Sequence, residues 1–329
     1  MGAGATTGTF SASPAGLIID ASNGEITPSS STPGTYTVTN TIAASGGCAA
    51  TSATASVTIT NRAVATFSYA ATPYCTTVSS AKVALGEGAT AGTFSASPAG
   101  LIIDASNGEI TPSSSTPGTY TVTNTIAASG GCAATSATAS VTITAAPIAA
   151  FSYAGSPYCT SATGSQAATL ASGASTGTFT AATGLSLDAS TGAITASTSA
   201  PGTYTVTNTI AASGGCAAVT ATATVIINAV PAITGQPQSA SKTVDQSVTF
   251  TATATGTGLS YQWYKGTPGP QTAISGATNA TYSIASLTTS DADDYYVVVS
   301  GTCAPALLAR PPRLLSIKLT RAAASRWPA

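Results

Sequence analysis

The six cysteines are the residues whose type and spacing most directly indicate chemistry, and they lie at positions 48, 75, 132, 159, 216 and 303. Two disulfide patterns compete. Cys75 and Cys159 are each followed, at one constant spacing, by another cysteine, Cys132 and Cys216. Alternatively, Cys48 could pair with Cys75 and Cys132 with Cys159, at a second and shorter constant spacing, which would leave Cys216 for Cys303.

The expected strand lengths favour the pairs Cys75–Cys132 and Cys159–Cys216. Each Ser-Gly-Gly-Cys run should form a hairpin before the last strand of a repeat, and that strand would span ~30 Å before the next repeat begins. A disulfide needs Cα atoms within about 7 Å, so a bond between repeats would require the chain to fold back. On this prediction Cys48 has lost its partner by truncation. Buried free thiols remain the alternative.

Other chemistry has less support in the sequence. The chain contains no histidine and no Cys-x-x-Cys pair, so zinc ligation is not expected. Two sets of carboxylates could serve in catalysis or calcium binding, but both flank expected turns, where Asp commonly caps backbone amides. We therefore expect no catalytic residue, no cofactor and no metal site. These carboxylates are Asp20, Glu25, Asp104 and Glu109, and then Asp291, Asp293 and Asp294.

Aromatic and amide side chains are the remaining candidates. Six aromatic residues could stack on sugars, although core and inter-module packing is the favoured interpretation. Three asparagines fall on the apolar row of an expected strand, and we interpret them as structural groups that bond to neighbouring backbone. The aromatic residues are Tyr69, Tyr74, Tyr153, Tyr158, Trp263 and Tyr264, and the asparagines are Asn40, Asn124 and Asn208.

The elements that must position these residues come from a sequence repeat of constant period. The run GTYTVTNTIAASGGC occurs at 34–48, 118–132 and 202–216, and residues 8–60 are identical to 92–144. Complete modules are expected at 61–145 and 146–229, with a truncated copy at 1–60. The chain is thus expected to open inside a repeat and to be a piece of a longer protein, with any secretion signal outside it.

The pattern within a repeat has period two. In TYTVTNTI (119–126), Tyr120, Val122, Asn124 and Ile126 share one face and threonines occupy the other. Such alternation is typical of half-buried strands, and Asn107-Gly108 suits a tight hairpin turn. Short strands separated by turns predict an all-β chain of sandwich modules in an elongated array.

The run GLSLDASTGAITASTSAPGTYTVTNTI (184–210) resembles the Putative-Ig (cadherin-like, PKD-like) repeats of Bacteroidetes-type bacterial surface proteins. The resemblance covers about residues 1–229 and implies an immunoglobulin-like fold without naming a ligand. Tyr36, Tyr120 and Tyr204, each preceded by Gly-Thr, are the expected tyrosine corners. The matching positions are Gly184, Leu185, Asp188, Thr191, Gly192, Ile194, Pro201, Gly202, Thr203, Tyr204 and Val206.

Residues 230–303 resemble an I-set-like immunoglobulin domain. Trp263 stands at the family's core tryptophan position and Tyr295 at its tyrosine corner, while Ala252 and Val297 replace the two core cysteines. The last strand could lie at 314–320. The atypical basic tail, 304–329, also fits a reading-frame error or the end of a gene fragment, and we assign it no function.

Composition narrows the function classes. Charged residues make up 6% of the chain and the net charge is −1, with no basic patch before residue 304, so nucleic acid is not an expected partner. No apolar run reaches the ~18 residues of a membrane helix. Paired cysteines would imply export to an oxidising compartment.

We therefore expect a non-catalytic stalk segment of a secreted or cell-surface bacterial adhesin. One alternative is a module that binds a glycan or a surface protein. The other is an extracellular filament subunit that self-associates through exposed strand edges.

Overall fold

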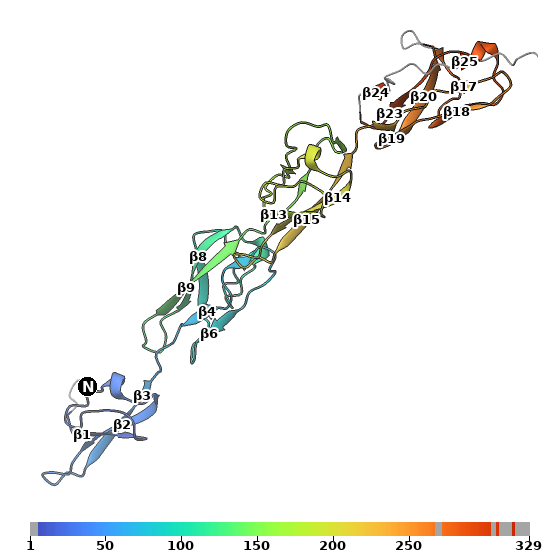
Figure 1. Cartoon of the computed structure of the whole chain (residues 1–329). Coiled ribbons are helices and arrows are strands. Elements are labelled where there is room, and N and C mark those ends of the chain that lie inside the picture. Colours follow the sequence, from blue (N-terminus) through green and yellow to red (C-terminus); the bar gives the residue numbers. More distant parts are fainter. Residues whose placement is uncertain (1–5, 267–271, 304–306, 309–317, 320–329) are drawn as a thin grey trace, which may run out of the picture. The chain divides into compact units, whose positions relative to one another are not determined.

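The computed structural model describes residues 6–266, 272–303, 307–308 and 318–319 (Figure 1). These residues form strands and four short 3-10 turns, with no α-helix among them, so the all-β prediction is confirmed. None of the described helical segments is long and apolar enough to cross a membrane. The four turns are η1 (Pro28–Ser30), η2 (Pro112–Ser114), η3 (Ala196–Thr198) and η4 (Thr289–Asp291).

One three-stranded antiparallel unit occurs in each of the three repeats. Its register is also repeated, because Gly34 faces Ile59, Gly118 faces Ile143 and Gly202 faces Ile227. The threonine-apolar alternation explains these strands, since one face packs inward and the other meets solvent. The strands are β1 (Thr9–Ser13), β2 (Gly34–Ile42) and β3 (Thr51–Ile59), then β7 (Thr93–Ser97), β8 (Gly118–Ile126) and β9 (Thr135–Thr144), then β13 (Thr178–Thr180), β14 (Gly202–Ile210) and β15 (Val219–Asn228).

A two-residue strand extends this sheet in the second and third repeats. Strand β5 (Tyr74–Cys75) pairs in parallel with the end of β9, and β11 (Tyr158–Cys159) pairs in the same way with the end of β15. The resulting sheets have the orders β5-β9-β8-β7 and β11-β15-β14-β13. Among the described residues, the first repeat has only the three-stranded sheet β1-β2-β3.

A second layer completes the core of these two repeats. Strands β4 (Phe67–Tyr69) and β6 (Val83–Leu85) pair in one repeat, and β10 (Phe151–Ser152) and β12 (Thr169–Leu170) pair in the next. Edge-to-face contacts join the layers, with ring centroids 5.4 Å apart for Phe67–Phe94 and 5.2 Å apart for Phe151–Phe179. Each core draws its buried residues from a single repeat.

The last domain has its own core around Trp263, which is fully buried and donates its indole N–H to the carbonyl oxygen of Asn279 (2.9 Å). Phe250, Ala252 and Val297 are buried in the same core. The two positions at which the sequence resemblance would place core cysteines are thus filled by buried small or branched side chains.

Ten strands are found among the described residues of this last domain. The larger sheet has the order β21-β20-β23-β24, and the remaining strands form the pairs β16-β19, β18-β22 and β17-β25. The bounds are β16 (Ala232–Gly235), β17 (Ser241–Lys242), β18 (Val248–Thr251), β19 (Thr253–Thr255), β20 (Ser260–Lys265), β21 (Thr272–Ala273), β22 (Thr281–Ile284), β23 (Tyr295–Ser300), β24 (Leu307–Leu308) and β25 (Lys318–Leu319).

The strand expected at 314–320 is described only at Lys318–Leu319, where β25 pairs with β17. The strand next to β23 is β24. The rest of the predicted strand and most of the predicted basic tail lie outside the described residues.

The chain forms two compact units, which comprise residues 1–146 with 213–216 and residues 147–212 with 217–329. The short turn Ser213–Cys216 thus belongs to the first unit, although its neighbours in the sequence belong to the second. The module boundaries expected from the repeat, and the elongated arrangement, stay predictions.

Candidate functional site

Two disulfides are the most distinctive sites of the molecule. Cys75 bonds to Cys216 with Cα atoms 4.7 Å apart, and Cys159 bonds to Cys303 with Cα atoms 5.8 Å apart. The bonded residues are 141 and 144 positions apart in the sequence. Each bond therefore joins the Tyr-Cys strand of one repeat to a cysteine of the following repeat or domain.

This pairing corrects the prediction of bonds within a repeat, Cys75–Cys132 and Cys159–Cys216. Cys75 lies beside Thr144 at the end of β9, whereas Cys132 precedes the start of β9. The full length of that strand separates the two cysteines, a distance of ~30 Å, which is several times the span of a disulfide. The same holds for Cys159 and Cys216 at the two ends of β15. The alternative pairs Cys48–Cys75, Cys132–Cys159 and Cys216–Cys303 are also wrong.

The Gly-Gly-Cys hairpin is shaped to approach the Tyr-Cys strand. Gly214 and Gly215 have φ angles of 56° and 76°, which suit a tight hairpin turn. A Cβ on Gly215 would lie 1.9 Å from the carbonyl oxygen of Pro73. Only glycine therefore allows the turn to bring Cys216 within bonding distance of Cys75.

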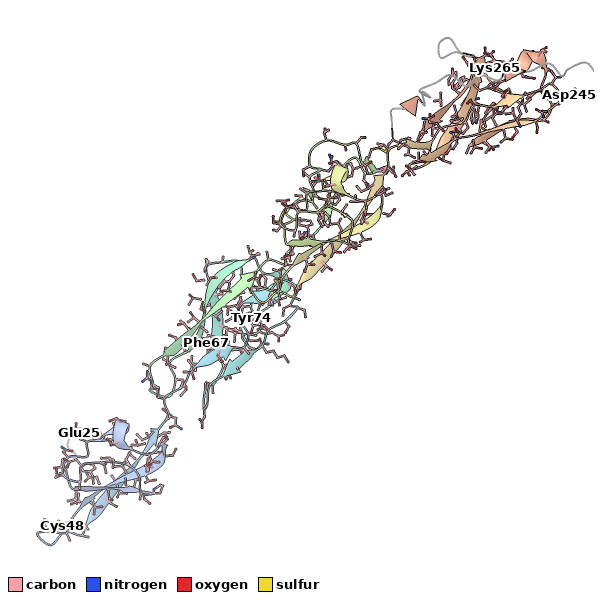
Figure 2. The ribbon with its side chains drawn as sticks, in the orientation of Figure 1. Glu25, Cys48, Phe67, Tyr74, Asp245 and Lys265 are labelled. Carbon is pink, nitrogen blue, oxygen red and sulfur yellow. A yellow bond between two sulfur atoms is a disulfide. The ribbon has the colours of Figure 1, made fainter. Side chains whose placement is uncertain are left out.

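Two cysteines are free thiols. Cys48 is exposed at the tip of the hairpin between β2 and β3 (Figure 2), and Cys132 is partly exposed at the equivalent position between β8 and β9. The Oγ1 atom of Thr60 lies 3.3 Å from the Cys132 sulfur and donates to the carbonyl oxygen of Gly130 (2.8 Å). Cys132 was a predicted disulfide residue, and the structure leaves it unbonded.

The tyrosines near the Tyr-Cys strands are buried, so their rings are not sugar-stacking platforms. Tyr158 donates its hydroxyl to the carbonyl oxygen of Ala154, and Tyr153 donates to that of Gly192 (2.6 Å each). Tyr69 and Tyr74 make the corresponding bonds in the second repeat. Burial raises the pKa of Tyr69 and of Tyr153 to about 12, so both stay neutral donors.

The four tyrosines expected at corners each donate a hydroxyl to the carbonyl oxygen four residues earlier. The oxygen–oxygen distances are 2.5, 2.6, 2.8 and 3.1 Å for Tyr36, Tyr120, Tyr204 and Tyr295. All four rings are buried. Burial raises the pKa of Tyr295. These bonds fix the loop before a strand to the strand itself.

The asparagines on the apolar rows of β8 and β14 bond to the backbone of neighbouring segments. Asn124 is fully buried, accepts the N–H of Gly92 (2.8 Å) and donates to the carbonyl oxygens of Ala65 (3.0 Å) and Thr90 (3.1 Å). Asn208 makes the equivalent three bonds. Asn124 thereby ties the segment before β4 to the central sheet.

Three of the seven candidate carboxylates, Asp20, Asp104 and Asp291, accept hydrogen bonds that close turns. Asp104 accepts the hydroxyl (2.6 Å) and the N–H (2.8 Å) of Ser106, which lowers the pKa of its carboxyl, and Asp20 does the same with Ser22. A lowered pKa disfavours a role as a general acid. Asp291 caps η4 by accepting the N–H (2.8 Å) and hydroxyl (2.7 Å) of Thr288. In the described part of the chain, no three metal-ligating side chains gather.

Comparison with known proteins identifies the type of domain. Residues 2–62 match the family described as "Putative Ig domain". Since residues 8–60 are repeated unchanged at 92–144, the same immunoglobulin-like fold occurs in tandem. A search of curated proteins gave no match.

Solved structures of tandem immunoglobulin domains are similar to the chain at low identity. The eight N-terminal Ig domains of Down Syndrome Cell Adhesion Molecule match at 12% identity and a TM-score of 0.47, over 96% of this chain and 44% of that one. A titin I-band fragment matches at 12% identity and a TM-score of 0.38, over 79% of this chain and 100% of the titin fragment. Drosophila OTK extracellular domains 3–5 match at 12% identity and a TM-score of 0.32, over 74% of this chain and 90% of the OTK chain.

Sequence reasoning missed the observed cysteine partners because the pairing depends on where the Tyr-Cys strand lies. That strand pairs in parallel with Ile143 and Thr144, at the far end of the same repeat, a contact that no local pattern specifies. One signal was available. Cys303 is the one cysteine of residues 230–329, so a disulfide to it within this chain has to come from an earlier repeat.

Proposed function

We propose that the chain is a structural segment of a secreted or cell-surface adhesin, in which disulfides link successive immunoglobulin-like modules against extension. The observation that carries the proposal is the pair of bonds Cys75–Cys216 and Cys159–Cys303. Each one provides a covalent route between repeats besides the peptide backbone. Disulfides persist in oxidising compartments, which supports an extracellular location.

The arrangement of the two bonds explains how they would resist extension. They interlock in sequence, because Cys159 lies inside the loop that Cys75–Cys216 closes and Cys303 lies outside it. If a β-sheet unfolds under force, the bonds prevent most of the residues between Cys75 and Cys303 from extending. The role requires neither a cofactor nor a catalytic group, and the bacterial origin is part of the proposal.

The test is to pull the full chain from its two ends by atomic-force spectroscopy, with and without a reductant. With both bonds intact, the shortest covalent path from Cys75 to Cys303 includes only the segment between Cys159 and Cys216. Reduction should therefore release on the order of 170 further residues, and at about 3.5 Å per residue the contour length should grow by roughly 600 Å.

Substitutions provide the controls. A chain carrying Cys75→Ser and Cys159→Ser should extend in this way without reductant. Cys132→Ser is the matched control and should behave as the unsubstituted chain. Equal contour lengths with and without reductant would contradict the proposal.

A second candidate function is recognition of a glycan or a surface protein by the last domain. Tyr264 and Tyr296 are cross-strand neighbours on β20 and β23, and their rings stack with centroids 5.1 Å apart and planes 7° apart. The buried hydroxyl of Tyr296 has no hydrogen-bond partner among the described residues. Tyr296 is itself buried, so the partly exposed ring of Tyr264 is the group that supports a binding face. A glycan array probed with the full chain and with Tyr264→Ala should show signals that the substitution removes, and an array without signals would argue against it.

A further inference from the structure

A cavity of about 460 Å³ lies beside the free thiol of Cys132. Its walls include Val57, Ile59 and Thr60 at the end of β3, together with Gly131 of the hairpin. All of them belong to the first compact unit. The volume falls within the ~300–1,000 Å³ range of ligand sites.

The same walls enclose a peptide segment in the next repeat. Ile59 and Thr60 correspond to Ile143 and Thr144, and Cys132 corresponds to Cys216. At that second place, the Tyr74–Cys75 strand pairs with Ile143 and Thr144, and its sulfur bonds to Cys216. The cavity is therefore a second copy of an occupied site.

Steric freedom at the glycine marks where an occupant would approach. A Cβ on Gly215 would meet the carbonyl oxygen of Pro73 at 1.9 Å, whereas a Cβ on Gly131 would meet nothing within 4 Å. The space that the Pro73–Tyr74 backbone fills beside Gly215 is thus open beside Gly131.

The edge of β3 and the apolar wall of the cavity are both suited to receive an extended segment. No described residue pairs with the outer edge of β3. Ile26 and Ile59 are half-buried, while their counterparts Ile110 and Ile143 are 0% and 2% exposed in the core that contains Tyr74. An aromatic ring would lie beside Ile59 as Tyr74 lies beside Ile143, in the core that also contains Ile110.

We propose that this cavity binds an extended Thr-Pro-Tyr-Cys segment of the kind found at residues 72–75. Its backbone would pair in parallel with Ile59–Thr60, its tyrosine would lie beside Ile59, and its cysteine would form a disulfide with Cys132. The site rests on the proposed function, since it is a further junction of the same kind.

The bond forms by thiol–disulfide exchange with a low-molecular-weight disulfide as the oxidant. The peptide thiol first forms a mixed disulfide with one half of the oxidant and releases the other half as a thiol. The Cys132 thiolate then attacks the peptide sulfur, the mixed S–S bond breaks, and the second half leaves as a thiolate. Both protein and peptide protons pass to the solvent or to the leaving thiolates.

The experiment uses the full chain and a synthetic peptide with the sequence of residues 71–76, activated as an aromatic mixed disulfide. Capture is followed by the released aromatic thiolate and mapped by mass spectrometry in Cys48→Ser and Cys132→Ser chains. We expect Cys132 to capture this peptide at least tenfold faster than a scrambled peptide, and Cys48 to show no preference.

A second variant separates recognition from thiol reactivity. Gly131→Ala should slow peptide capture at Cys132 while a small aromatic disulfide still reacts at the original rate, and Gly47→Ala, at the same position beside Cys48, should change neither. Equal rates for both peptides, or chains dimerised through Cys132, would overturn the proposal. If capture fails while the Cys75–Cys216 link is mapped in the same sample, the proposed function stands and only this site is wrong.

Discussion

Residues 8–60 and 92–144 have the same sequence and the same register, and their strands differ only in that β9 is one residue longer than β3, but their burial differs. Phe94, Val122 and Ile143 are at most 2% exposed, while Phe10, Val38 and Ile59 are only half-buried. The difference arises because residues 61–91 supply β4, β5 and β6, which cover the second copy. Local sequence is sufficient for the hairpins, but a closed core requires the covering strands.

The largest difference in stability loss between the two copies is expected when the equivalent phenylalanines Phe94 and Phe10 are replaced. Phe94→Ala should destabilise its module by about 3–5 kcal/mol because it leaves a cavity in a closed core. At about 4–8 °C per kcal/mol, one calorimetric transition of the full chain should fall by about 12 °C or more. The matched change Phe10→Ala should cost about 1 kcal/mol or less, since its half-buried ring leaves a site that water reaches. Equal losses would show that the first copy is covered as well.

Replacing the equivalent asparagines, Asn124 and Asn40, should also destabilise the second copy more than the first, but by a smaller margin. Asn124→Ala leaves the buried carbonyl oxygen of Ala65 and the N–H of Gly92 without their partner, at a cost of about 1–3 kcal/mol. Among the described residues, Asn40 bonds only to Gly8 and Thr6, and it is half-buried, so Asn40→Ala should cost less than about 1 kcal/mol. Thermal unfolding of the two variants compares them directly, and a larger loss for Asn40→Ala would contradict the role given to residues 61–91.

The tyrosine corners should behave alike in the two copies. Tyr36 and Tyr120 are each 3% exposed and each donate to a carbonyl oxygen four residues earlier. Tyr36→Phe and Tyr120→Phe should each cost about 0.5–1.5 kcal/mol, as measured by hydrogen exchange in the loop before the strand. A cost confined to Tyr120→Phe would mean that the corner depends on the covering strands.

The smallest expected effect on stability comes from protonation of the turn carboxylates Asp20 and Asp104. Ser22 lowers the pKa of Asp20, and Ser106 lowers that of Asp104. Because the folded pKa is the lower one, the turn contributes stability above the ordinary Asp value of about 3.9 and loses it as the pH falls through the folded pKa. Carboxyl ¹³C titrations should give low midpoints in both copies, and Ser22→Ala or Ser106→Ala should raise the midpoint of its own partner. A midpoint at the ordinary value in either copy would show that the turn is open.

Much of the fold could be predicted from local pattern. The alternation in TYTVTNTI specifies a half-buried strand, the constant period specifies repetition, and Trp263 marks the core of the last domain. Each is read directly from the order of residues, because side chains alternate along a strand and turns need particular residues. The alternation and the turns were sufficient for the all-β prediction, and the resemblance to Putative-Ig and I-set domains implied the immunoglobulin-like fold and the core position of Trp263.

The cysteine pairing could not be predicted from the sequence pattern. It depends on the Tyr-Cys strand lying beside Thr144 rather than beside the hairpin of its own repeat. The sequence by itself determined the strands, the turns and which cysteines recur. Only the tertiary structure decided which sulfurs meet and which copy has a closed core, because both depend on contacts between residues far apart in the chain.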